Sequence, residues 1–93
     1  MGAQRSRLLE TEMTRTGARV VVCETHLDAA RARILTDYLL DLAGRVPGGR
    51  LDVDLGNVRD LCPGYLGTLM GVGRKLRAGG VQLTLTGEVF EAA

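Results

Sequence analysis

The sequence has few aromatic residues, few cysteines and almost no net charge, and each shortage excludes a class of function. Aromatic residues are 3% of the 93 residues and tryptophan is absent, so the core must be aliphatic and single-stranded nucleic acid finds no stacking platform. Twelve basic residues against eleven acidic ones give a formal net charge of +1. Because the cations are scattered, no surface of one sign is available for a nucleic-acid backbone. We predict that the chain does not bind nucleic acid.

Cysteines and long apolar runs are also scarce. Two cysteines, Cys23 and Cys62, do not make the disulfide scaffold of a small secreted domain. The N-terminus lacks the apolar core of a signal peptide, and the unbroken apolar runs are far shorter than a membrane span. We therefore expect a cytoplasmic protein that does not insert into a membrane. The length fits a single domain, residues 1–93, in which residues 1–7 form a flexible N-terminus.

The pattern of the first half predicts a hairpin followed by a helix. Strands at residues 8–14 and 19–23 should be joined near Thr16-Gly17, and the three consecutive valines predict that the second strand is buried on both faces. Asp28 should cap the helix that follows, because its carboxylate can accept free amide N–H groups of the first turn. The apolar face of that helix has helical spacing and consists of Leu27, Ile34, Leu35, Tyr38, Leu39 and Leu42.

The second half predicts a strand, a helix, a strand and a short final helix. Residues 51–55 and 81–85 alternate in polarity, Pro63-Gly64 opens the intervening helix, and Gly79-Gly80 ends it. A further helix should begin at Thr86 or Gly87. The order β-β-α-β-α-β-α favours parallel crossovers. We therefore predict an α/β fold, with a mixed four-stranded sheet and helices mainly on one face.

Glycine and aspartate patterns do not indicate a phosphate site. Gly64, Gly67 and Gly71 would line one face of the second helix, where they favour close approach to the sheet or to a partner. They do not form a phosphate-cradling loop, since no G-K-[ST] follows. Asp54 ends a strand as a phosphoacceptor does, but no acidic pair accompanies it. Asp52 and Asp54 are better interpreted as solvent-facing or loop-anchoring residues.

Cys23, His26 and Cys62 offer three ligands of the kind that zinc prefers, but the second pair is incomplete. A buried Cys23 and a loop residue His26 are the simpler interpretation. A Cys–His pair also lacks an orienting third group and a pocket, so catalysis is not predicted. We predict no enzyme, no cofactor, no catalytic residue and no metal ligand. A thiol or metal sensor that uses Cys23 and Cys62 stays as a minor alternative.

One stretch resembles a known family. Residues 54–69, DLGNVRDLCPGYLGTL, resemble the signature of STAS domains, the anti-sigma-factor antagonist modules. Asp54-Leu55 matches the D-L that ends a strand, and Leu66-Gly67 matches the helix start. The segment THLD, residues 25–28, stands where the family often has G-E-L-D, and residues 77–83 look like its R-x-x-G-G-x-L. The order of elements agrees over nearly the whole chain.

The resemblance implies a STAS-like fold and a protein-binding function. Family members dock an anti-sigma factor or an ATPase-fold serine kinase, and this docking frees a sigma factor. The partner-binding residues that the resemblance implies are Thr25, His26, Asp28, Cys62, Pro63, Gly64, Tyr65, Leu66 and Thr68. Burial against the sheet is an equal alternative for Tyr65 and the favoured one for Leu66.

The sequence departs from the family where members that switch carry a phosphorylated serine. Pro63 takes the serine position and Cys62 the preceding aspartate position, and Thr68 lies beyond the first helical turn. Proline has no hydroxyl, so no phosphorylation site is implied. Two alternatives remain: a small STAS-like subunit of a lipid-transport ABC complex, and a scaffold component of a stress-sensing assembly. A homodimer is also compatible with the pattern.

Overall fold

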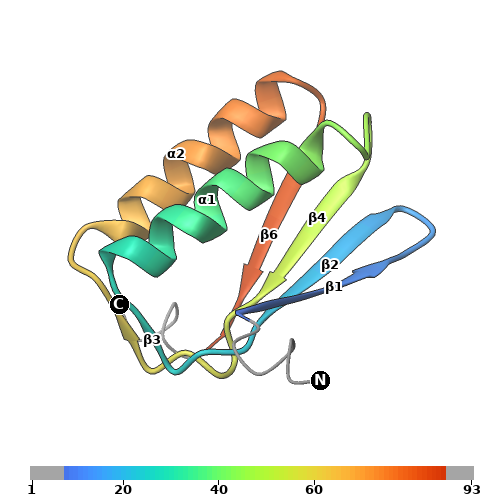
Figure 1. Ribbon diagram of the computed structural model, residues 1–93. Helices are drawn as coiled ribbons and strands as arrows, with labels where there is room; N and C mark the ends of the chain where they lie inside the picture. Colours follow the sequence, from blue (N-terminus) through green and yellow to red (C-terminus); the bar gives the residue numbers. More distant parts are fainter. Residues whose placement is uncertain (1–7, 88–93) are drawn as a thin grey trace.

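Four strands form one mixed sheet in the order β1-β2-β4-β6 in the computed structural model, which describes residues 8–87 (Figure 1). The strands are β1 (Leu9–Met13), β2 (Gly17–Val22), β4 (Arg50–Asp54) and β6 (Gln82–Thr86). β1 pairs antiparallel with β2, and the other two pairs are parallel. The predicted α/β fold with a mixed four-stranded sheet is confirmed. Thr86 is the last residue of β6 and Gly87 is not helical, so the expected final helix does not begin at either residue. Residues 88–93, where that helix would continue, and residues 1–7 lie outside the described residues.

The hairpin turn brings β2 close to β4 from its first residue. Gly17 pairs with Arg50, and a Cβ atom at Gly17 would lie 1.9 Å from the Arg50 carbonyl oxygen. A glycine is therefore required at this position. The Thr14 amide donates to the Gly17 carbonyl at 2.9 Å, and the Gly17 amide donates to the Thr14 hydroxyl at 3.1 Å. These bonds close the turn predicted near Thr16-Gly17.

Both helices, α1 (Ala29–Ala43) and α2 (Tyr65–Ala78), cover the same face of the sheet (Figure 1). Asp28 caps α1 as predicted, because its Oδ1 atom accepts the Arg31 amide at 2.9 Å. The predicted apolar face of α1 is correct except for Ile34, which is 54% exposed. The core between helices and sheet is aliphatic, and its largest fully buried side chains are Leu27, Leu35, Leu39, Leu51, Leu55, Leu69, Val20, Val22 and Val53.

The opposite face of the sheet carries polar side chains that α1 and α2 do not cover. Arg19 is exposed and Val21 is half-buried, so the prediction that β2 is buried on both faces is wrong. Successive side chains of a strand point to opposite faces, so Ala18, Val20 and Val22 reach the core while Arg19 and Val21 point to the other face. Asp52 and Asp54 of β4 lie on the open face and are half-buried.

Two short strands form a second, separate ladder that the sequence did not predict. β3 (His26–Leu27) pairs in parallel with β5 (Asp60–Leu61). β3 leads into α1, and β5 comes just before α2, so this ladder ties together the entries of the two helices. Within residues 8–87, no helix is long and apolar enough to cross a membrane.

Candidate partner-binding surface

The β3–β5 ladder places the two predicted partner-binding segments side by side. The Arg59 and Asp60 amides donate to the Thr25 carbonyl at 2.7 and 3.2 Å, and the Cys62 amide donates to the Leu27 carbonyl at 2.8 Å. Segments separated by more than thirty residues in the sequence are thereby fixed at one end of the molecule. The sequence located each segment, but the pairing that joins them depends on backbone groups that side-chain patterns do not reveal.

Exposed charges surround the beginning of α1. His26 Nδ1 lies 2.7 Å from Asp60 Oδ2, and both side chains are about 70% exposed. Asp28 Oδ2 accepts from the Arg31 guanidinium at 2.8 Å. The hydrogen bond from the Arg31 amide, helped by that guanidinium, lowers the pKa of Asp28. The predicted residues Thr25, His26 and Asp28 therefore form a polar, solvent-exposed rim.

A shallow groove of about 450 Å³ lies between the first half of α1 and the beginning of α2. Arg33 contributes the one charge among its lining residues, so the groove is mainly apolar with one cationic side. Five of the nine predicted partner-binding residues line it. The lining residues are Ala29, Ala32, Arg33, Thr36, Cys62, Pro63, Gly64, Tyr65 and Thr68.

Tyr65 belongs to the floor of the groove. Its side chain is buried, at 4% exposure, and its hydroxyl donates to the Ala32 carbonyl at 2.9 Å. The Thr36 hydroxyl lies 2.9 Å from the Tyr65 hydroxyl oxygen. Because the Tyr65 proton is already donated to Ala32, Thr36 is the donor in this second hydrogen bond. Burial raises the pKa of Tyr65 above its usual value. Tyr65 is therefore buried, with its hydroxyl held against α1, and Leu66 is half-buried. Contact of either residue with a partner stays a prediction.

The beginning of α2 is open. Gly64 precedes the helix with φ +82°, in the left-handed region that favours glycine, and no side chain caps the first turn. Pro63 and Thr68 are exposed, and the Thr68 hydroxyl donates to the Gly64 carbonyl at 3.4 Å.

The glycines of α2 do not bring it close to the sheet in the way predicted. A Cβ atom at Gly64, Gly67 or Gly71 would meet no atom within 4 Å. Close packing occurs instead at Gly73, where a Cβ atom would lie 3.4 Å from a methyl group of Leu83. The three predicted glycines therefore line an open face of the helix, and their approach to a partner stays a prediction.

The three possible zinc ligands do not form a cluster. Cys23 is exposed, with its thiol 3.7 Å from the Val21 carbonyl, so the prediction of a buried Cys23 is wrong. His26 lies in β3 rather than in a loop, and Cys62 is half-buried. Between Leu8 and Gly87, no group of three His, Cys, Asp or Glu residues could hold a metal ion.

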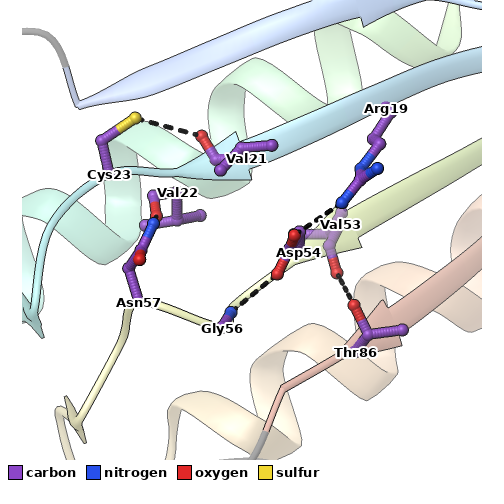
Figure 2. Close-up of polar contacts among 9 residues, drawn as sticks. All are labelled: Arg19, Val21, Val22, Cys23, Val53, Asp54, Gly56, Asn57 and Thr86. Carbon is purple, nitrogen blue, oxygen red and sulfur yellow. Dashed lines mark hydrogen bonds and ion pairs between the residues drawn. The ribbon is translucent and has the colours of Figure 1, made fainter.

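Asp54 anchors the loop that follows β4 (Figure 2). Its Oδ1 atom accepts the Gly56 amide at 2.8 Å, and its Oδ2 atom lies 2.7 Å from the Arg19 guanidinium. These contacts, led by the Gly56 amide, lower the pKa of Asp54. Asn57 holds the same loop to β2 by donating to the Val22 carbonyl at 3.2 Å. The loop-anchoring interpretation of Asp54 is correct, whereas the roles of Arg19 and Asn57 were not predicted.

Comparison with known proteins identifies the fold. No protein-family model and no curated protein sequence matches the chain. A candidate anti-sigma factor antagonist from Thermotoga maritima superposes with a TM-score of 0.67 at 13% identity, covering 96% of this chain and 77% of that one. The structure of a protein named Mglu superposes with a TM-score of 0.68 at 17% identity, covering 82% of this chain and 18% of that one. This chain therefore has the fold of the anti-sigma factor antagonist and spans a small part of Mglu.

Proposed function

We propose that the chain is a non-enzymatic regulator of the anti-sigma-factor-antagonist type, which acts in the cytoplasm by binding an anti-sigma factor or an ATPase-fold serine kinase. The fold is that of a candidate anti-sigma factor antagonist. The stretches that resemble STAS motifs include residues 25–28, just before α1, and residues 54–69, which run from the end of β4 into α2. The surface proposed for binding consists of the α1–α2 groove and the polar rim of Thr25, His26 and Asp28.

The observation that carries this proposal is the groove itself. The β3–β5 ladder and the Tyr65 hydroxyl fix the beginnings of both helices relative to each other, so the groove is formed before any partner arrives. A preformed surface loses less conformational entropy on binding than one that must be ordered. Its apolar lining and the single charge of Arg33 fit a partner segment that is apolar and carries an acidic residue.

The regulation proposed for this chain differs from the phosphorylation of a serine before α2. Pro63 is exposed at the corresponding position and offers no hydroxyl. Thr68 is exposed, but its hydroxyl already donates to the Gly64 carbonyl within the helix. We infer that binding is controlled by the amount of protein present rather than by phosphorylation at this site.

Affinity capture from the source cells, compared between matched variants, tests the proposed function. The full chain serves as bait, and the bound proteins are identified by mass spectrometry. Thr68→Arg adds a large cation to an exposed residue of the groove, whereas Ala78→Arg adds the same side chain to an exposed residue at the other end of α2. An anti-sigma factor or serine kinase of the ATPase fold should bind the wild type and Ala78→Arg but be lost from Thr68→Arg.

Two outcomes would contradict the proposal. Capture of a transporter ATPase in place of a sigma-factor regulator would assign the chain to the lipid-transport alternative. Equal capture of the ATPase-fold partner by both variants would show that the groove is not the binding surface. Circular dichroism of both variants controls for loss of the fold.

A further inference from the structure

The outer edge of β6 presents backbone groups that could pair with another strand. β6 is the last strand of the order β1-β2-β4-β6. The Gln82 amide donates to the Gly49 carbonyl at 3.1 Å, and the Thr86 carbonyl accepts the Leu55 amide at 2.7 Å, both toward β4. Because backbone groups alternate sides along a strand, those of Leu83 and Leu85 point to the outer edge. Such an edge is a template for pairing with a further strand.

The two edges of the sheet differ in how they are protected. β1 carries Glu10 and Glu12, and charged side chains on an edge strand discourage pairing with another chain. β6 has the sequence QLTLT, without a charge or a proline. Its threonines and leucines are compatible with a paired strand. Among the residues that the structure describes, the β6 edge is therefore the less protected of the two edges.

Apolar side chains lie beside this edge. Leu83 and Leu85 point toward the helices but are only half-buried, and Met70 of α2 is 56% exposed. A groove of about 280 Å³ runs between α2 and β6, with the lining residues Leu69, Met70, Gly73, Arg74, Arg77, Gln82, Leu83 and Leu85. A strand added to β6 would bury part of this apolar surface.

We propose that β6 pairs antiparallel with β6 of a second copy of this chain, around a two-fold axis at Thr84. Thr84 is the middle residue of the strand, so this register pairs β6 over its full length and sets Leu83 opposite Leu85 of the partner subunit. The strand carries no charge, so no like charges meet across the axis.

The dimer is independent of the proposed function. The α1–α2 groove contains Thr68, whereas Leu69 and Met70 line the β6 groove on the other flank of α2. Pairing at β6 therefore leaves the proposed partner surface free. Self-association is measured without any partner, so failure of the dimer and failure of the proposed function are distinguished.

Sedimentation equilibrium of the full chain, from low micromolar to submillimolar concentration, tests the dimer. The wild type should dimerise reversibly. In this register Thr84 faces Thr84 of the partner subunit with Cα atoms about 4.5 Å apart. Thr84→Lys and Thr84→Glu should each raise the dissociation constant about fivefold, because like charges then oppose each other. An equimolar mixture of the two variants should reverse that rise by forming a heterodimer.

Glu12→Lys is the matched control, since it changes the charge of the opposite edge, and it should dimerise like the wild type. A wild type that stays monomeric would overturn the proposal. Charged variants that dimerise like the wild type would also overturn it, as would a mixture that associates no more tightly than either variant alone. If the charged variants do not fold, Thr84→Cys in a Cys23→Ser, Cys62→Ser background decides. Its thiols lie within disulfide range across the axis and should cross-link on oxidation, and absence of the cross-link would overturn the dimer.

Discussion

At the scale of single residues, the Tyr65 hydroxyl joins α2 to α1. Removing it in Tyr65→Phe takes from the Ala32 carbonyl the donor that links it to α2, and leaves the Thr36 hydroxyl without its acceptor. We expect a loss of about 1–2 kcal/mol in the free energy of unfolding, because a buried polar group loses its partner. Urea denaturation measures this loss.

A double-mutant cycle with Thr36→Val separates the hydrogen bond from other effects of the tyrosine substitution. The two substitutions should cost less together than the sum of their separate costs, because both remove the same interaction. Strict additivity would show that Thr36 and Tyr65 do not interact.

Asp54 makes the stability of the fold depend on pH. Its pKa is lowered in the folded protein by the Gly56 amide and the Arg19 guanidinium, so its contribution is present above the unfolded pKa and is lost as pH falls through the folded value. Asp54→Asn should therefore reduce the loss of stability as pH falls from about 5 toward about 2. Urea denaturation across this range measures the effect. Asp52→Asn is the control, and an equal reduction in that variant would contradict the role of Asp54.

Pro63 determines whether the usual phosphorylation can occur. If an ATPase-fold serine kinase is the partner, the wild type should take up no phosphate between residues 62 and 68 when incubated with that kinase and ATP. Pro63→Ser places a hydroxyl at the exposed position before α2 and should become phosphorylated. Mass spectrometry of the intact chain and its peptides measures both. Phosphorylation of the wild type at Thr68 would contradict the account.

At the scale of the elements, α2 presents an open glycine face. Gly67 and Gly71 lie inside the helix with space for a Cβ atom, so Gly67→Ala and Gly71→Ala should each increase stability by about 0.5–1 kcal/mol. Gly73→Ala should gain less, since its Cβ atom would press on Leu83 at 3.4 Å. Chemical denaturation of the three variants gives the ranking. A loss of stability in Gly71→Ala would show that this face is covered.

The same elements show what the sequence could predict. Strand alternation and the Asp28 cap predicted the order of the four sheet strands and the two helices, with strand bounds within one or two residues of those observed. These features were predictable because each depends on neighbours in the sequence. The three valines of β2 led to the wrong prediction that the strand is buried on both faces. Valine favours any strand, whether one or both of its faces are covered. The β3–β5 ladder and the floor position of Tyr65 depend on contacts between distant segments, so local patterns could not reveal them.

At the scale of the whole molecule, two surfaces lie on opposite flanks of α2. The α1–α2 groove and the exposed rim at β3 form the proposed partner surface, and the β6 edge forms the proposed dimer contact. If both proposals hold, a complex with the partner should contain two copies of this chain. Light scattering on the purified complex measures its mass, and a complex with a single copy would show that the partner displaces the dimer.

The central claim is that a partner binds at the beginnings of α1 and α2. Amide hydrogen exchange of the full chain, with and without the purified ATPase-fold partner, tests it most directly. Binding should slow exchange in residues 25–33 and 62–68 and leave β1 unchanged. Protection confined to β1 or to the open face of the sheet, with none at the groove, would contradict the account.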